Sequence, residues 1–174
     1  ASGIRIFDNK VSTIPGIIKL TLGEPDMNTP EHVKTAAIES IRNNDSHYAP
    51  QKGKLELRQA ISNYLKKATG VVYDPETEIV VTVGATEAIN ATLFSITNPG
   101  DKVAIPTPVF SLYWPVATLA DADYVLMNTS EDNFKLTPER LESTLKEESN
   151  IKAVILNYPV NPTGVEYTES EIRA

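Results

Sequence analysis

Apolar residues recur at helical spacing in two segments near the start of the chain. Val33, Ala37 and Ile41 repeat every four positions, which predicts an amphipathic helix. Thr29 and Pro30 precede this stripe, so we expect the Thr29 hydroxyl to cap the helix and Pro30 to occupy its first position. A second apolar stripe predicts a helix from about 54 to 69 that ends at Gly70. Residues 1–28 show no such pattern and are expected to be irregular.

From residue 78 onward, short apolar runs alternate with helical segments. The runs predict strands at 79–83, 102–105, 124–127 and 152–157. Helices are predicted between them at 86–96, at 112–119 and from Thr137 onward, where Pro138 again follows a capping residue. Runs that are apolar throughout are typical of parallel strands covered on both faces. The predicted fold class is α/β, a mostly parallel sheet with helices on both faces.

The last residues carry a helix-start signal. Thr168-Glu169-Ser170-Glu171 fits a capping box, in which the threonine and the second glutamate satisfy each other's backbone donors. Three residues follow, and a helix of one turn does not repay its nucleation cost. We therefore expect the chain to stop inside an element and to be part of something longer. The alternative is a frayed polar tail.

Composition narrows the classes of function. The chain of 174 residues has 16 Lys and Arg against 23 Asp and Glu, a net charge of -7, which disfavours nucleic acid and anionic membrane surfaces as partners. Its apolar runs fall short of the roughly 20 residues that span a bilayer. With no cysteine, and with His32 and His47 in no ligand pattern, we expect no metal site. A cytoplasmic protein is the default expectation.

Candidate chemistry lies at the junctions between strands and helices, because ligands of open parallel sheets bind beyond the carboxyl ends of the strands. After the first predicted strand, Gly84 precedes Ala85 and Thr86. Backbone amides at a helix N-terminus, together with the Thr86 hydroxyl, can hold a phosphate. The alternative is an ordinary helix entry in which Thr86 is the cap. The sequence contains neither a G-x-G-x-x-G nor a P-loop motif after any strand, which argues against nucleotide sites.

Two further junctions carry aromatic and amide groups. Residues 106–114 deliver Phe110, Tyr113 and Trp114 to the sheet edge, where aromatic rings can cover a flat heteroaromatic ring or simply belong to the core. Residues 157–164 form a proline-rich turn in which X-Pro bonds can be cis. The side-chain amide of Asn161 can donate there to an anionic or phenolic oxygen, although a plain turn explains the same sequence.

Together these segments resemble the class I/II aminotransferases, the fold type I enzymes that use pyridoxal 5'-phosphate. The resemblance runs from about residue 18 to 172. It also includes Gly23-Glu24-Pro25-Asp26, Tyr48-Ala49-Pro50-Gln51-Lys52-Gly53 followed by Leu57-Arg58, and Asn98-Pro99-Gly100-Asp101. It implies amino acid and 2-keto acid substrates and a ping-pong transfer of the amino group. Within the family, the sequence looks most like the branch of aromatic and N-acetyl-diaminopimelate aminotransferases.

The resemblance implies a role for each junction. Ala85 and Thr86 match the positions that bind the cofactor phosphate, and Phe110 matches the aromatic residue that stacks on the pyridine ring. Tyr113 matches a position beside the partner of the ring nitrogen. Asn161 matches the asparagine that donates to the cofactor's phenolic oxygen and lies near the substrate carboxylate.

Two earlier positions complete the implied site. Gly23 matches the glycine whose backbone approaches the substrate. Tyr48 matches the tyrosine that reaches the phosphate of the partner subunit, so the resemblance implies a homodimer with shared sites. It also implies that residues 1–28 are an N-terminal arm belonging to the small domain and that 29–174 are the first part of the cofactor-binding large domain.

The chain departs from the family pattern in the residues that carry out the reaction. The lysine that holds the cofactor as a Schiff base lies far downstream in the family, in a Ser-x-x-Lys or Ser-x-Ser-Lys setting, and none of the lysines here occupies a comparable place. The aspartate of the ring nitrogen and the arginine of the substrate carboxylate lie beyond Ala174, as does the strand that pairs with 79–83 in the family. We therefore assign no catalytic residue and expect the isolated chain to be inactive. The alternatives are a nucleotide-binding α/β domain of another enzyme and a non-catalytic, aminotransferase-like ligand sensor.

Overall fold

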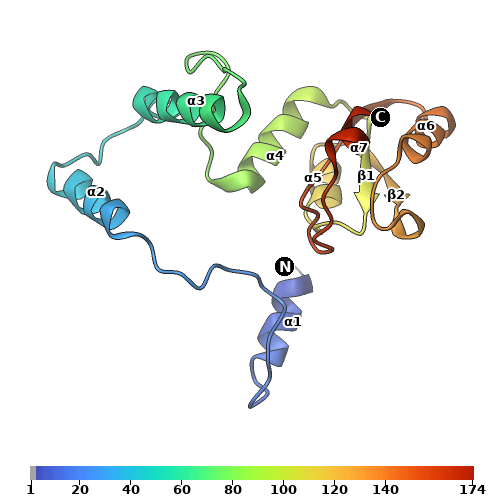
Figure 1. Ribbon diagram of the computed structural model, residues 1–174, viewed down its shortest axis with the longest axis horizontal. Helices are drawn as coiled ribbons and strands as arrows, with labels where there is room; N and C mark the ends of the chain where they lie inside the picture. The colour runs from blue at the N-terminus through green and yellow to red at the C-terminus, as the bar shows by residue number, and fades with distance from the viewer. Residues whose placement is uncertain (1–2) are drawn as a thin grey trace. The chain divides into compact units, whose positions relative to one another are not determined.

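The computed structural model describes residues 3–174. The chain divides into two compact units, one ending at Ala49 and the other spanning Pro50–Ala174. Figure 1 shows the order of the elements in each unit. The predicted division at residues 28 and 29 assigns segments to the domains of the aminotransferase family, and it stays a prediction.

The first unit contains two helices, α1 (Gly3–Val11) and α2 (Glu31–Arg42). The prediction that the whole of 1–28 is irregular was wrong for α1, where Ile4, Phe7 and Val11 recur at helical spacing. The helix predicted after Pro30 is confirmed. Its cap was predicted wrongly, because Pro30 itself is the N-cap, with ψ of 145°, and no side chain caps the helix. Extended backbone at Pro30 starts the helix one residue later than expected, beyond the reach of Thr29.

The second unit is built on three parallel strands, β1 (Lys102–Thr107), β2 (Asp123–Asn128) and β3 (Ile151–Val154), in the order β2-β1-β3. They confirm three of the predicted strands and the α/β fold class. The crossovers through α5 (Tyr113–Leu119) and α6 (Pro138–Glu147) lead to opposite sides of β1. Because parallel crossovers are right-handed, α5 and α6 cover opposite faces of the sheet, as Figure 1 shows.

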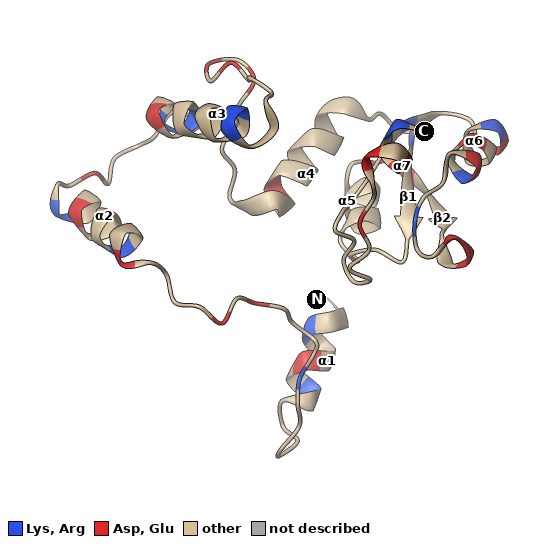
Figure 2. Ribbon diagram, in the orientation of Figure 1, with Lys and Arg blue, Asp and Glu red and all other residues tan. Residues whose placement is uncertain are grey.

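The core of this unit lies between β1, α5 and α4 (Gly84–Ile96). Val103 and Ile105 of β1 are fully buried and pack against Val116 of α5 and Leu93 of α4. Figure 2 shows that α4 carries no charge apart from Glu87 in its first turn. Burial of Leu93 of α4 and of the β1 side chains fixes the strand whose carboxyl end leads to Phe110.

The strand predicted at 79–83 does not form, and this prediction was wrong. In the described residues 3–174 the segment lacks a neighbouring strand, and a strand is stable only as part of a ladder. It is instead fixed by α3 (Leu55–Thr69) and the turn before it. The N–H of Val81 donates to the carbonyl of Lys52 at 3.0 Å. A Cβ on Gly53 would lie 2.7 Å from the Val81 side chain, so this approach requires glycine.

The predicted helix ends are confirmed where they rest on local signals. Gly70 ends α3 with a positive φ of 78°, and Thr137 caps α6 by accepting from the N–H of Arg140 at 3.3 Å. The capping box opens α7 (Glu169–Arg173), with the Thr168 N–H donating to Glu171 Oε2 at 2.7 Å. These ends need no distant partner, so sequence alone predicts them.

No helix in residues 3–174 combines the length and the apolar character needed to cross a bilayer. The same residues hold no group of three or more histidine, aspartate or glutamate side chains arranged to bind a metal ion.

Candidate functional site

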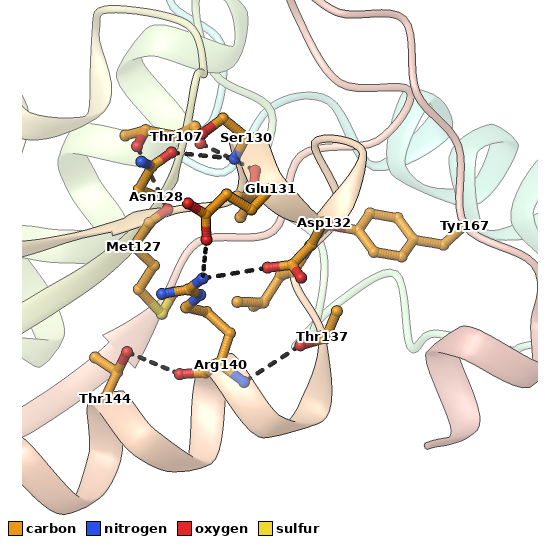
Figure 3. A network of polar contacts seen from close by, with 12 residues as sticks. Thr107, Met127, Asn128, Ser130, Glu131, Asp132, Thr137, Arg140, Thr144 and Tyr167 are labelled. Carbon is orange, nitrogen blue, oxygen red and sulfur yellow. Dashed lines mark hydrogen bonds and ion pairs between the residues drawn. The ribbon is translucent and has the colours of Figure 1, made fainter.

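The carboxyl end of β1 is held against the loop that follows β2. Thr129 is 1% exposed, and both its N–H and its Oγ1 donate to the carbonyl of Thr107 at 2.9 Å. This loop continues into the short 3-10 helix η1 (Ser130–Asp132). Figure 3 shows Arg140 of α6 beside it, 3.4 Å from Asp132 Oδ2 and 4.0 Å from Glu131 Oε2. Thr107 is thereby fixed immediately before the Phe110 segment.

Phe110 and Tyr113 lie together after β1. Their ring centroids are 6.1 Å apart with an angle of 85° between the planes, an edge-to-face arrangement that favours aromatic pairs. Tyr113 is buried, and burial raises the pKa of its hydroxyl. Phe110 remains 38% exposed, so it is not a core residue and its ring is accessible to a ligand. Trp114 instead packs against the core.

The start of α4 presents backbone donors. The Val83 N–H donates to the Glu87 carboxylate, and the Gly84 N–H donates to the carbonyl of Thr82 at 2.9 Å. Gly84 has a φ of 77° and is the first residue of the helix, so Thr86 lies within the first turn and is not the cap that the alternative of an ordinary helix entry required. Ala85 and Thr86 lie in the first turn, where backbone N–H groups lack acceptors within the helix. A Cβ added to Gly84 would meet no atom within 4 Å. This end of α4 therefore combines open space with donors suited to an anion.

The turn after β3 carries Asn161. The Tyr158–Pro159 and Asn161–Pro162 bonds are both cis, which confirms the expectation for this turn. The Asn161 N–H donates to Asn157 Oδ1 at 3.0 Å, and the Gly164 N–H donates to the carbonyl of Val160 at 2.6 Å. Val160 is buried and Asn161 is exposed, so the turn is anchored while the side-chain amide stays accessible.

The segments that follow the three strands meet at one edge of the sheet. They enclose a cavity of about 10 Å³ lined by Pro106, Pro108, Val109, Thr129, Phe134, Ile155, Leu156, Asn157, Val160 and Tyr167. Pro108 and Val109 lead directly to Phe110, and Asn157 and Val160 flank the start of the Asn161 turn. The structure therefore brings together the Phe110 segment and the Asn161 turn.

Gly23 and Tyr48 belong to the first unit, where both are exposed. The chain segment leading to Gly23 is tied to α1 through Asp8, whose carboxylate accepts a hydrogen bond from the Thr21 hydroxyl and lies 3.5 Å from Lys19 Nζ. The bond from Thr21, followed by Lys19, lowers the pKa of Asp8. The predicted roles of Gly23 and Tyr48 stay predictions.

The sequence analysis assigned no structural role to two residues of the second unit, Arg58 and Asn157. Arg58 of α3 is 8% exposed, and its guanidinium donates to the carbonyls of Gly53, at 3.1 Å from Nε, and Pro75. The signal available was an arginine within the first turns of a helix that follows a glycine turn. Asn157 was read only as part of a turn, and its bond to Asn161 depends on the fold of that turn.

Comparison with known proteins relates the whole chain to one group. Residues 15–174 match the family model described as aminotransferase class I and II. The chain is 44% identical over 173 residues to the probable N-acetyl-LL-diaminopimelate aminotransferase of Bacillus subtilis, covering 99% of this chain and 44% of that protein. It is 38% identical over 172 residues to aromatic-amino-acid aminotransferase 2 of Thermococcus litoralis, covering 98% and 44%.

A solved structure gives the same relation. The aromatic aminotransferase from Pyrococcus horikoshii superimposes with a TM-score of 0.86 at 38% identity, covering 95% of this chain and 44% of that one. The chain thus spans less than half the length of the relatives it matches.

Proposed function

We propose, because this chain belongs to the class I and II aminotransferase family, that the protein carrying it transfers an amino group between an amino acid and a 2-keto acid with pyridoxal 5'-phosphate. The activity is proposed for the whole protein, since the chain spans 44% of its Bacillus subtilis relative. The observation that carries the proposal is the meeting of the Phe110 segment and the Asn161 turn at one sheet edge.

The residues present fit the three chemical groups of this cofactor. A phosphate suits the backbone amides of Ala85 and Thr86 and the Thr86 hydroxyl, at a helix end whose partial charge favours anions. A flat ring suits the exposed face of Phe110, and a phenolic oxygen suits the side-chain amide of Asn161. Tyr113 supports this assignment through its edge-to-face contact with Phe110.

Bound pyridoxal phosphate supplies an electron-withdrawing ring that stabilises negative charge on the substrate's α-carbon. The residues of this chain bind and orient it: Ala85 and Thr86 hold the phosphate, Phe110 covers the ring, and Asn161 donates to the phenolic oxygen and faces the substrate carboxylate. Gly23 admits the substrate beside its backbone. None of the lysines here occupies a place comparable to that of the family's Schiff-base lysine, so we propose that the isolated chain is inactive.

The same proposal includes a homodimer in which Tyr48 reaches the partner's phosphate. Tyr48 is fully exposed, and α2 buries none of its residues although Val33, Ile38 and Ile41 are apolar. A helix gains most of its stability from packing an apolar face, so a second subunit is a suitable cover for α2.

A cytoplasmic location agrees with the absence of cysteine from the sequence.

Absorption spectroscopy of the intact protein tests the proposal. We expect added pyridoxal phosphate to produce a bound-cofactor band that an amino acid bleaches, and Thr86→Ala and Asn161→Ala to weaken cofactor binding. Borohydride treatment of the 174-residue chain is expected to leave no lysine-linked cofactor. Binding of a nicotinamide or adenine nucleotide without any response to pyridoxal phosphate would contradict the proposal. Amino acid binding without turnover would indicate the ligand sensor instead.

A further inference from the structure

The side chain of Asn157 holds the backbone of Asn161. Asn157 Oδ1 accepts the hydrogen bond from the Asn161 N–H at 3.0 Å, across a turn of four residues. Asn157 is partly buried and directly follows the stretch that continues β3, in which the Ile155 N–H donates to the carbonyl of Ala104 of β1 at 3.0 Å. The acceptor therefore stands next to the sheet, whereas its donor belongs to the exposed part of the turn.

The remaining bonds of the turn fix its buried side. The Val160 N–H donates to the carbonyl of Val165 at 2.8 Å, and the Val160 carbonyl accepts from Gly164. These bonds anchor Val160, which is 8% exposed. The bond that Asn157 accepts acts one residue later, on the backbone N–H of the residue that carries the proposed cofactor contact.

Asn157 also lies against the segment that carries Phe110. It lines the small cavity together with Pro108 and Val109, which follow β1. Asn157 thus lines a cavity shared by the two segments that the proposed function assigns to the ring and to the phenolic oxygen. An asparagine is suited to this place because its amide oxygen accepts from a backbone N–H without adding charge beside the ligand.

We propose that Asn157 is a positioning residue for the cofactor, acting through Asn161; the inference rests on the proposed function. Asn157 fixes where the Asn161 amide donates. A donor aimed at an anionic oxygen stabilises the anion and lowers the pKa of the corresponding acid. When the bond from the Asn161 N–H to Asn157 is lost, the phenolic group of the bound cofactor therefore has a higher pKa, and the cofactor binds more weakly.

The test compares Asn157→Leu with a matched control in the intact protein. Asn128 has the same chemistry at the end of β2, where its Oδ1 accepts from the Ser130 N–H at 3.0 Å, so Asn128→Leu removes an equivalent bond away from Asn161. For each variant, the pKa of the bound cofactor is read from its absorption between pH 5 and 9, and its dissociation constant from titration with pyridoxal phosphate. Melting of the cofactor-free protein reports folding.

We expect Asn157→Leu to raise the dissociation constant about 2- to 10-fold, the effect of one ordinary hydrogen bond, and to raise the pKa of the bound cofactor. Asn128→Leu is expected to leave both unchanged. In an Asn161→Ala background, Asn157→Leu is expected to have no further effect, because the two residues act as one unit. Asn157→Ala gives the same test with a smaller side chain if the leucine variant does not fold.

Two outcomes overturn the inference. One is a folded Asn157 variant with the wild-type pKa and dissociation constant; the other is an effect of equal size with and without Asn161. Both presuppose that the unmodified protein binds pyridoxal phosphate. If the unmodified protein does not bind pyridoxal phosphate, the proposed function is refuted. That result is distinct from either outcome that overturns the role of Asn157.

Discussion

Thr129 donates two hydrogen bonds to a single carbonyl oxygen, that of Thr107, from its N–H and from its Oγ1. The backbone bond continues the pairing of β1 with β2 by one residue beyond the ladder, which ends at Thr107 and Asn128. The side-chain bond adds a second attachment at the point where the chain leaves the sheet toward Phe110. The end of the ladder is thereby tied to the loop that precedes α6.

Replacement of Thr129 by valine removes only the side-chain bond. Because Thr129 is 1% exposed and valine has nearly the same shape, we expect a loss of about 1–2 kcal/mol in the free energy of unfolding. Urea unfolding of the intact protein measures it. Thr92→Val is the control, since the Thr92 hydroxyl donates to the Ala88 carbonyl on the exposed side of α4, and a change below about 0.5 kcal/mol is expected there. Equal losses in the two variants would contradict the prediction.

Arg58→Met tests the buried guanidinium beside the glycine turn. The substitution keeps an unbranched side chain but leaves the carbonyls of Gly53 and Pro75 without their donor. We expect a loss of about 2–4 kcal/mol in the free energy of unfolding, because partly buried acceptors that lose a charged donor are costly. Arg42→Met at the exposed end of α2 is the control and should change the stability by less than about 0.5 kcal/mol. Chemical denaturation of both variants measures these losses. An Arg58→Met protein as stable as the unmodified protein would refute the role given to the hydrogen bonds of Arg58.

Gly53→Ala and Gly70→Ala separate backbone strain from a steric clash. Both glycines have positive φ, 89° and 78°, but a Cβ at Gly53 would lie 2.7 Å from Val81 whereas one at Gly70 would meet no atom within 4 Å. We expect Gly70→Ala to cost about 1–2 kcal/mol from strain alone, and Gly53→Ala to cost at least about 1 kcal/mol more because the packed neighbour must move. Thermal melting of the two variants measures the difference. A smaller cost at Gly53 would show that the contact with Val81 is not maintained.

Sequence reasoning succeeded where the determining contacts are local. The capping box at Thr168 and the stop at Gly70 depend on residues within one or two turns, and the three parallel strands follow from apolar runs long enough to identify. It failed at 79–83, because a strand-like composition does not provide a neighbouring strand. The helix at Gly3–Val11 was missed because its stripe of apolar residues is short.

The same difference between local and distant contacts applies to the candidate site. Residue types at strand ends pointed to Phe110 and Asn161, because the carboxyl edge of a parallel sheet is set by topology. The support of the Phe110 segment did not follow from spacing, because Thr129 contacts Thr107, 22 positions away. The same holds for Arg58, which contacts Pro75, 17 positions away. Such contacts depend on how separate elements pack, which one sequence does not reveal.

Acid titration tests the attachment of α7 to the loop before α6. Lys135 Nζ donates to both carboxylate oxygens of Glu171, at 2.6 and 2.9 Å, and Thr168 donates to the same group. These bonds, that from Lys135 foremost, lower the pKa of Glu171 from its ordinary 4.5 to about 2. Since the pKa is lower in the folded protein than in the unfolded chain, ionised Glu171 stabilises the fold above pH 4.5. That contribution is lost as the pH falls from 4.5 to 2.

Lys135→Gln removes the main cause of this shift, so we expect the Glu171 pKa to rise toward 4.5. The stability of the variant should then fall less steeply than that of the unmodified protein as the pH drops from 4.5 to 2. Lys146→Gln provides the control, because Lys146 pairs at 2.7 Å with Glu142 on the exposed face of α6, where ion pairs contribute little. Urea unfolding at several pH values gives the slopes. Identical slopes for Lys135→Gln and the unmodified protein would show that Glu171 does not depend on Lys135, and α7 would then be held by its capping box alone.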